Sequence, residues 1–480
     1  MHNIIWISTL QNNSFGEVTK KYYNAIKKFS NWNITLLDIR DENIFEKIIK
    51  SQPNFVIILW NDKNIKDFSE NLYKIRDKWN GKFAPFVPID FENPIIDLIS
   101  YECDFYLSLN EWGSYILKNI VNKPVYTLEH IVDGFTEYSL IKRCQLKQKF
   151  WGDKFRDHFI IGCVNANLSR KRLDITIKTF NLFYQYNKKS LLVIKTTKPD
   201  YNIVACNYTD LSKFTPYRNN VIVITDYLTY QGLNDLYNSF DIMINTTDGE
   251  GFGLIPFEAS LAGTLSIIPY HTSFKALIPL DSKFIVKDNT KVPYEYARNS
   301  DDIYEILEGK TVRYIARNYH SNSTCLSFIS DDTDCAKFII SRLSFSNDVN
   351  NIYSNIEELC INLKRFLELQ RTKSEQNIEY QIGVTSDIES IRYVASIIHE
   401  LPNYIDNIIH IEKYSLDRYI SIHSPQVSIV NPVDMFNKLK FFYENRKEIS
   451  IENKKFQKKI QQFSEKNIFN KLQKILNENI

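Results

Sequence analysis

Short apolar segments alternate with helical segments along much of this chain of 480 residues, and this alternation constrains the fold more than any other feature. The first series of expected strands comprises Asn3–Ser8, Ile34–Asp38, Phe55–Trp60, Phe86–Asp90, Phe105–Leu109 and Val125–Leu128. The second comprises His158–Val164, Leu191–Lys195, Val221–Thr225, Ile242–Asn245 and Leu265–Pro269. Strands that alternate with helices form βαβ units, so each series predicts a parallel, doubly wound α/β sheet.

The length implies at least two domains, because a single hydrophobic core stops growing at roughly 250–300 residues. We expect an N-terminal Rossmann-like domain over residues 1–150 and a second over 151–435, followed by C-terminal helices over 436–480. The charged segment Lys142–Lys154 is expected to link the two domains. A helix is predicted over Glu17–Phe29, directly after the first loop.

Composition places the chain among soluble globular proteins, with 44% hydrophobic and 24% charged residues. The formal net charge of +2 gives no reason to expect a nucleic-acid partner. No apolar run approaches the ~20 residues that span a bilayer, and the first residues lack the features of a signal peptide, so a soluble, cytoplasmic protein is expected. The seven cysteines and eight histidines show no metal-binding spacing, and we expect no metal site.

One segment carries the clearest functional signal, namely the two glutamates Glu250 and Glu258 with Gly251 and Gly253 between them. It follows the apolar run Phe240–Ile244, which predicts a buried strand, and it leads into a helical segment closed by a glycine. Ligands bind at the carboxyl ends of strands in such sheets. Glycines let the backbone approach a ligand, and amides at a helix N-terminus favour anions. Backbone donors for phosphate beside carboxylates for hydroxyls describe a nucleotide-sugar pocket.

The segment resembles the E-x7-E motif of retaining glycosyltransferases of family 4, also called group 1. That resemblance implies the GT-B fold, with two Rossmann-like domains facing a cleft. It also implies that Glu250 binds hydroxyls of the donor sugar and that Glu258, expected in the first turn of the helix, binds the ribose. The donor diphosphate would contact the backbone around four residues, Gly251, Phe252, Gly253 and Leu254.

A second segment, Cys163–Asp174, is similar to the loop in which family members carry an Arg/Lys pair for the donor diphosphate. Arg170 and Lys171 are the expected pair, with Arg172 in reserve because one step of register would exchange them. A departing nucleoside diphosphate gains negative charge in the transition state, and fixed cations stabilise that charge. A basic run of three residues can otherwise be a solvated helix start.

The N-terminal domain offers weaker signals. Gly16 stands where the family has glycines that approach the donor phosphate, although a plain turn glycine explains it equally well. Asp90 stands where many members have a histidine that contacts the donor sugar, and it could accept a hydrogen bond there. His130, in a stretch similar to the family's domain junction, is expected near the cleft or packed at the hinge.

The region from about 294 to 423 has no counterpart in the family pattern and is expected to be a mostly helical insertion. Its helices are predicted over Asn351–Leu369 and Ile388–Leu401. The insertion can be a passive surface element, or a lid or partner-binding subdomain. The lysine-rich C-terminal helices are expected to pack back toward the first domain. Their charged face is either solvated or in peripheral contact with an anionic membrane.

The resemblance implies a hexosyl-type glycosyltransferase of class EC 2.4 that retains the anomeric configuration. Its donor would be a nucleoside-diphosphate sugar, with no other cofactor, and its acceptor a glycan, a lipid or a protein. The alternative is a catalytically inactive GT-B scaffold that binds nucleotide sugar or glycan. A third class, GT-B phosphorylases, uses a lysine-bound pyridoxal cofactor, and no segment here resembles its site.

Overall fold

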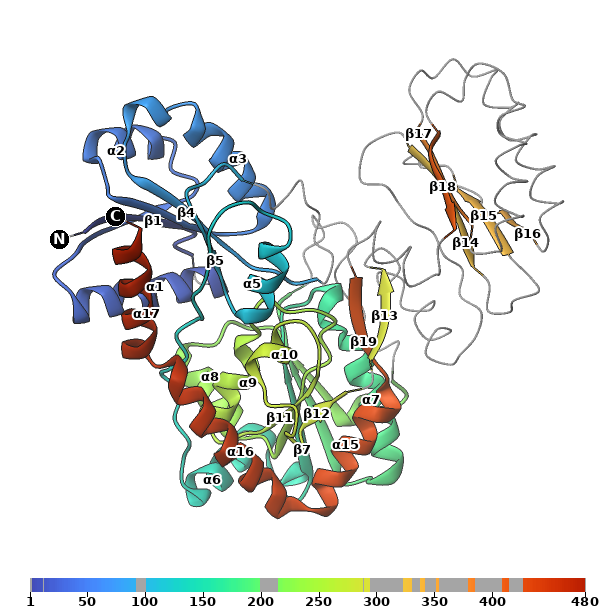
Figure 1. The fold of residues 1–480 in the computed structure, drawn as a ribbon. Coiled ribbons are helices and arrows are strands. Elements are labelled where there is room, and N and C mark those ends of the chain that lie inside the picture. The colour runs from blue at the N-terminus through green and yellow to red at the C-terminus, as the bar shows by residue number, and fades with distance from the viewer. Residues whose placement is uncertain are drawn as a thin grey trace. The chain divides into compact units, whose positions relative to one another are not determined.

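The structure is a computed structural model, and it describes residues 2–11, 13–91, 101–198, 215–287, 289–293 and 426–479 together with five strands between 323 and 413. The chain forms two compact units (Figure 1). One unit comprises Met1–Asn289 and Ser428–Ile480, and the other comprises Thr290–Val427. The candidate site lies in the first unit.

The N-terminal half of the first unit contains a parallel sheet of six strands in the order β2-β1-β3-β4-β5-β6. The strands are β1 (Asn3–Ser8), β2 (Asn33–Asp38), β3 (Phe55–Leu59), β4 (Lys82–Val87), β5 (Tyr106–Ser108) and β6 (Val125–Thr127). The helices described here are α1 (Ser14–Phe29), α2 (Ile44–Ser51), α3 (Asp62–Tyr73) and α5 (Glu111–Lys118). A 3-10 turn, η1, covers Arg76–Lys78.

A second parallel sheet of six strands has the order β12-β11-β10-β7-β8-β9. Its strands are β7 (Phe159–Val164), β8 (Ser190–Lys195), β9 (Val221–Ile224), β10 (Ile242–Ile244), β11 (Ser266–Pro269) and β12 (Ile285–Val286). Its helices are α7 (Leu173–Tyr186), α8 (Tyr230–Asn238), α9 (Leu254–Leu261) and α10 (Ser273–Leu277). Counted along the chain, the strands follow the order of dinucleotide-binding Rossmann domains.

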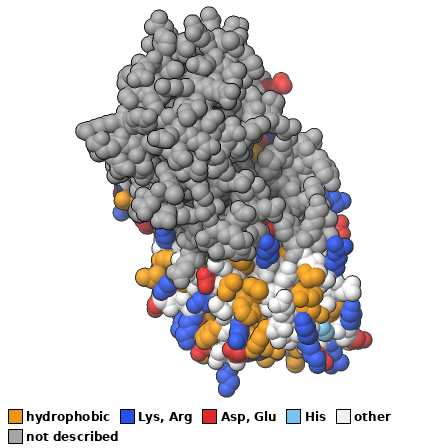
Figure 2. All heavy atoms as spheres, turned by 90° about the vertical axis from the view of Figure 1, so that its right-hand side faces the viewer, with side chains coloured by type: hydrophobic (Ala, Val, Ile, Leu, Met, Phe, Trp, Pro, Cys, Tyr) orange, Lys and Arg blue, Asp and Glu red, His pale blue; other side chains and the backbone are white. Residues whose placement is uncertain are grey.

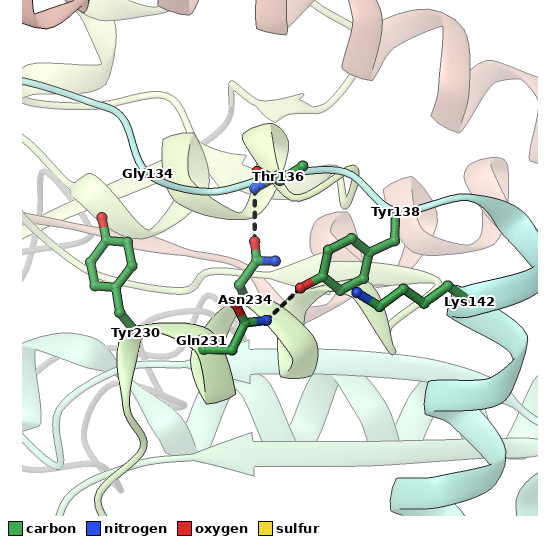
Figure 3. A pocket seen from close by; sticks show the side chains of 7 residues that line it. All are labelled: Gly134, Thr136, Tyr138, Lys142, Tyr230, Gln231 and Asn234. Atoms are coloured by element: carbon green, nitrogen blue, oxygen red, sulfur yellow. Dashed lines mark hydrogen bonds between the residues drawn. The ribbon is translucent and has the colours of Figure 1, made fainter.

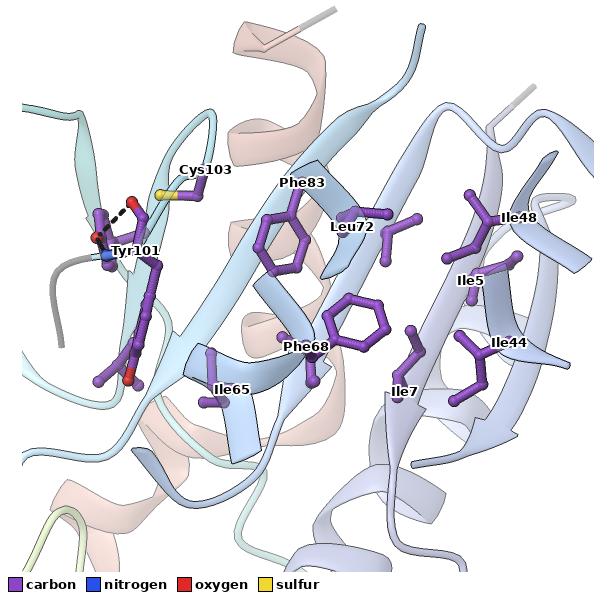
Figure 4. Packing of buried hydrophobic residues seen from close by; sticks show 14 of the residues in the cluster. Ile5, Ile7, Ile44, Ile48, Ile65, Phe68, Leu72, Phe83, Tyr101 and Cys103 are labelled. Atoms are coloured by element: carbon purple, nitrogen blue, oxygen red, sulfur yellow. Dashed lines mark hydrogen bonds between the residues drawn. The ribbon is translucent and has the colours of Figure 1, made fainter. Parts of the chain in front are cut away.

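The two sheets confirm the prediction of an α/β protein with two Rossmann-like, doubly wound domains. The central strands are buried on both faces, which explains why their sequences are continuous apolar runs instead of alternating ones. Figure 4 shows the packing on one face of the first sheet, where Phe68 and Leu72 of α3 lie over the strand residues Ile7 and Phe83.

Asparagine, abundant in this chain, often begins its helices. Asn13, Asn61, Asn110 and Asn431 each accept a hydrogen bond from a backbone N–H in the first turn of α1, α3, α5 and α15 respectively. Such a side chain satisfies one of the amides that a helix N-terminus leaves unpaired. The polar residues between the apolar runs therefore fix where these helices start.

Three local expectations need correction. The charged segment expected to be a linker forms helix α6 (Leu140–Trp151), followed by a 3-10 turn at Asp153–Phe155. Arg143 anchors α6, because its guanidinium donates to the carbonyls of Asn238, Phe240 and Gly263 near the C-terminal ends of α8 and α9. Strand β4 begins and ends earlier than predicted, which leaves Asp90 in the loop beyond it. Helix α1 begins three residues before its predicted start.

The C-terminal helices α15 (Pro432–Glu444), α16 (Arg446–Ile460) and α17 (Glu465–Glu478) contact helices of both domains. Helix α15 lies against α7, α16 against α9, and α17 against α1 (Figure 1). On α1, Lys28 Nζ pairs with Glu465 at 2.5 Å. The chain therefore runs from the second domain back along the first.

The other unit contains a five-stranded sheet in the order β16-β15-β14-β17-β18. The strands are β14 (Ser323–Ile329), β15 (Lys337–Ser341), β16 (Asn351–Tyr353), β17 (Glu379–Val384) and β18 (Ile408–Lys413). The prediction of a mostly helical insertion did not include this sheet. The first three residues of the helix predicted over Asn351–Leu369 form β16; its remainder and Ile388–Leu401 lie outside the described residues. Strand β13 (Asn289–Pro293) pairs with β19 (Gln426–Val430), where the chain enters and leaves this unit.

Figure 2 shows one face of the molecule, on which lysine and arginine side chains of the described residues are interspersed with carboxylates and hydrophobic side chains. This mixture agrees with the small net charge of +2. Among the helices that the structure describes, none combines the length and the apolar character needed to cross a membrane.

The contacts of Arg143 predict that Arg143→Met lowers the free energy of unfolding by roughly 3 kcal/mol, because several buried or half-buried carbonyls lose a charged donor. Denaturant unfolding would measure the loss. Lys149→Met, on the exposed face of the same helix, is the matched control and should change stability little. Equal stability of the two variants would contradict the anchoring role of Arg143.

Candidate functional site

The candidate site lies where the strand order of the second sheet reverses, between the neighbouring strands β7 and β10. The chain leaves β7 through residues 165–172, which include the 3-10 turn Ser169–Lys171, and it leaves β10 through residues 245–253. Both loops emerge at the carboxyl ends of adjacent parallel strands, where open α/β sheets bind ligands. The topology therefore brings the two segments that the sequence singled out to one edge of the sheet.

Glu250 is the centre of this edge and is only 6% exposed. Lys171 Nζ donates to Glu250 Oε1, and Arg170 Nη1 donates to Glu250 Oε2 at 3.2 Å. Arg170 Nη1 also lies 2.9 Å from the carbonyl oxygen of Gly249. The structure thus brings together Glu250, Arg170 and Lys171, and their charged groups bind one another.

The charges of this group depend on one another. Burial alone would raise the pKa of Glu250, but Lys171 and Arg170 outweigh it and hold that pKa at about 2. Burial works against the charge of Arg170 as well, yet the carboxylates of Asp90 and Glu250 raise its pKa overall. For Lys171, burial and the neighbouring Arg170 prevail and lower the pKa. Glu250 is therefore a carboxylate near neutral pH.

Arg172, predicted as a reserve cation, lies in the interior instead of beside Glu250. It is 1% exposed, and its guanidinium forms an ion pair with Asp174. Its backbone is in the left-handed region, with φ 48° and ψ 49°, at the start of α7. The three consecutive basic residues therefore have different partners, because Arg172 pairs with Asp174 whereas Arg170 and Lys171 pair with Glu250.

Asp248 belongs to the same group, although the sequence analysis did not select it. It is 1% exposed, and its Oδ1 has no hydrogen-bond partner among the described residues. Its amide donates to the carbonyl of Arg170 at 2.8 Å, so it lies against the cationic loop. Burial raises its pKa to about 8, although Arg172, Arg170 and Lys171 oppose the shift. Its position two residues before Glu250 was the feature of the sequence from which Asp248 could have been selected.

The first domain contributes directly to the site through the loops that follow β4 and β5. Asp90 Oδ2 lies 3.9 Å from Arg170 Nη2, and Asn110 Nδ2 donates to the carbonyl of Gly251. A Cβ at Gly249 would lie 2.2 Å from the carbonyl oxygen of Asp90, so only glycine permits this approach. The predicted Asp90 is therefore near the predicted cations, across the boundary between the two domains.

Glu258 lies in a different environment from Glu250. Helix α9 begins at Leu254, so Glu258 is in its second turn, and the prediction of the first turn was wrong. Tyr237 Oη donates to Glu258 Oε2 at 3.2 Å. Burial raises the pKa of Glu258, and the ammonium of Lys21 on α1 opposes the shift. Lys21 in turn pairs with Asp133 Oδ1 at 3.1 Å.

The remaining residues predicted for the site lie in different environments. Gly253 has φ 79° and is the N-cap of α9, so no N-cap side chain accepts a hydrogen bond from the amides of the first turn, which begins with Leu254. Phe252 is buried, with its ring 5.1 Å from that of His130. Burial lowers the pKa of His130 to about 3, so its buried imidazole is neutral. A Cβ at Gly16 would lie 2.0 Å from the carbonyl oxygen of Gln11, so its own loop requires this glycine.

A pocket of about 390 Å³ opens beside the residues that surround Glu258, between α8 and the segment that connects the domains (Figure 3). Its lining is polar and aromatic, and consists of Gly134, Thr136, Tyr138, Lys142, Tyr230, Gln231 and Asn234. Tyr230 Oη donates to the carbonyl of Asp133, the residue that pairs with Lys21. The pocket therefore adjoins the residues around Glu258.

No protein-family model matches this chain. No curated protein matches it either.

Solved structures do resemble it. HepE from Anabaena in complex with UDP and glucose has a TM-score of 0.46 and 10% identity, over 60% of this chain and 86% of that one. The α,α-trehalose 6-phosphate synthase from Burkholderia multivorans has a TM-score of 0.46 and 11% identity, over 64% and 89%. The UDP-forming α,α-trehalose-phosphate synthase from Burkholderia xenovorans, in complex with glucose-6-phosphate, has a TM-score of 0.43 and 11% identity, over 59% and 89%. At these values the likeness concerns the overall fold only, and the fold assignment depends on the strand orders of the two sheets.

Proposed function

We propose that this chain is a retaining, hexosyl-type glycosyltransferase of class EC 2.4 that moves a sugar from a nucleoside-diphosphate sugar to an acceptor. The observation that carries the proposal is the position of Arg170, Lys171 and Glu250 at the switch point of a Rossmann-ordered sheet. Fixed cations beside a carboxylate suit a ligand that carries both a diphosphate and sugar hydroxyls.

In the proposed reaction, Arg170 and Lys171 stabilise the charge that develops on the departing diphosphate. Amides in the first turn of α9 support the same phosphates, since a helix N-terminus attracts anions. Glu250 accepts hydrogen bonds from donor-sugar hydroxyls, and Glu258 binds the ribose diol. As the family resemblance implies, the leaving phosphate would assist in deprotonating the acceptor on the same face of the sugar.

An anionic ligand would have to enter this site by exchange, because the charges of the site are already balanced. Three cations of this cluster face three carboxylates, namely Arg170, Lys171 and Arg172 against Asp90, Glu250 and Asp174. Asp248 would add a fourth negative charge, which accords with its raised pKa and with a neutral carboxyl group. A diphosphate would then have to replace carboxylates around Arg170 and Lys171. The contact between Asp90 and Arg170, at 3.9 Å, is the longest of these pairs and the easiest to exchange.

A second candidate is a catalytically inactive scaffold that binds nucleotide sugar or glycan. The observation that favours it is Asp90, which stands in the expected place of a donor-contacting histidine and faces Arg170. A carboxylate there competes with the diphosphate for the same cation. The two candidates differ in turnover of the donor and not in binding.

A panel of UDP-, GDP- and ADP-sugars separates the candidates by thermal shift and by release of the diphosphate in the absence of acceptor. One nucleotide class should stabilise the protein and be slowly hydrolysed. Glu258→Ala should weaken binding of that nucleotide about tenfold or more, because a charged acceptor for the ribose is lost. Stabilisation without hydrolysis would support the scaffold instead. No response to any donor would contradict the transferase and leave only a scaffold that binds glycan.

Lys171→Met should lower the rate of sugar transfer or donor hydrolysis on the order of 10²-fold, because the leaving diphosphate loses a fixed cation. Lys189→Met, at an exposed position before β8, is the matched control and should keep the wild-type rate. Thermal melting of both variants checks the fold, which Arg170 should preserve by holding Glu250. A wild-type rate in Lys171→Met would exclude Lys171 from the chemistry.

The raised pKa of Asp248 predicts how the stability of the protein depends on pH. With an ordinary pKa of 3.8 and a folded pKa of about 8, the folded state keeps a proton that the unfolded state loses between these values. Stability attributable to this group is therefore present below the lower pKa and is lost as pH rises toward the higher one. The melting temperature of the wild type, relative to Asp248→Asn, should fall between pH 4 and pH 8. A constant difference, or a rising one, would mean that Asp248 is ionised in the fold.

A further inference from the structure

The loop between β11 and α10 contains a residue in a conformation that its side chain disfavours. Thr272 has φ 42° and ψ −126°, a region that β-branched residues rarely adopt. Thr272 and His271 are almost completely buried, at 0% and 1% exposure. Strained backbone of this kind persists where surrounding interactions hold it, and it often occurs near functional sites. Neither residue was selected from the sequence.

The interactions that hold Thr272 lead directly to Glu250. The backbone N–H of Glu250 donates to Thr272 Oγ1 at 3.1 Å. Thr272 Oγ1 also lies 3.1 Å from His271 Nδ1, and His271 Nε2 lies 2.7 Å from the carbonyl oxygen of Thr247. The side chain of Thr272 thus connects two points of the loop that follows β10.

The directions of these hydrogen bonds follow from the groups involved when the imidazole of His271 is neutral. A carbonyl can only accept, so His271 Nε2 carries the hydrogen that is donated to Thr247. In the neutral imidazole Nδ1 is then an acceptor, and the hydroxyl of Thr272 donates to it. That hydroxyl is left free to accept from the Glu250 amide. The hydroxyl of Thr272 therefore donates one hydrogen bond, to His271, and accepts another, from the Glu250 amide.

Two further contacts brace the same loop. Ser273 N–H donates to the carbonyl of Glu250 at 3.4 Å, and Ser273 Oγ donates to the carbonyl of Phe252 at 3.2 Å. Within the loop, Thr247 Oγ1 donates to the carbonyl of Gly249 at 3.0 Å. The peptide groups on both sides of Glu250 are consequently tied to residues 271–273.

We infer that Thr272 is a positioning residue for Glu250. The hydroxyl of Thr272 fixes the backbone of Glu250, and the backbone of Thr272 itself is strained. The inference rests on the proposed function, since it assigns Thr272 to the donor-sugar end of that site. A displacement of about 1 Å in a substrate-contacting group can reduce a rate severely. Thr272 should therefore affect turnover much more than nucleotide affinity, which the proposal assigns to Glu258.

Three substitutions separate positioning from simple structural support. Thr272→Ser keeps the hydroxyl, Thr272→Val keeps the shape without it, and Thr272→Gly removes the hydroxyl together with the strain. Turnover of the donor should remain close to wild type in Thr272→Ser. It should fall about tenfold or more in both other variants, with little change in the Kd of the free nucleoside diphosphate. Thr272→Gly should nevertheless melt at a higher temperature than Thr272→Val, because glycine accepts the positive φ.

The decisive readout is an equal loss of rate in Thr272→Val and Thr272→Gly despite their different melting temperatures. A rate that follows melting temperature across the three variants would overturn the inference, and so would a wild-type rate in Thr272→Val. Hydrogen exchange of residues 245–253, followed by mass spectrometry, tests the bracing without any activity. Exchange should accelerate in Thr272→Val and not in Thr272→Ser, and unchanged exchange would also overturn the inference. If the wild type turns over no donor, the proposed function fails, while hydrogen exchange still decides the role of Thr272.

Discussion

The buried contact of Glu250 with Lys171 and Arg170 organises the site. Two loops that are distant in the sequence meet because β7 and β10 are neighbours, and these ion pairs join them. Removing a charge of this kind from water is unfavourable unless a partner compensates it, so the loops must stay in register with each other. The turn at Arg172, the unpaired oxygen of Asp248 and the strained Thr272 all lie around this contact.

The first domain contributes residues to the candidate site. Its β4 and β5 loops contact the glycines beside Glu250, and Asp90 reaches Arg170 from across the boundary. The closest approach occurs where the side chain is a single hydrogen, at Gly249. A change in the charge around Arg170 would therefore act on the contact between the two domains.

Local patterns predicted much of this architecture. The β10 strand, the glycine loop and α9 are contiguous, so the sequence around Glu250 was sufficient to place it at a strand end. Arg170 and Lys171 were selected through the family resemblance of their segment. Residues whose role depends on distant neighbours were missed. Nothing near Thr272 indicates that it meets Glu250, and nothing near Lys21 indicates that it faces Glu258. Helix α6 was taken for a linker because its main anchor, Arg143, is polar.

The pairing of β13 with β19 has a consequence for the history of this chain. Paired strands lie about 4.8 Å apart, so the segment between them leaves and rejoins its host at nearly the same point. Closing the host chain across that point would require only a short turn. A unit attached in this way can be gained, lost or exchanged in a single genetic event while the two Rossmann-like domains keep their fold. The five-stranded unit can therefore change while the fold around the candidate site stays the same.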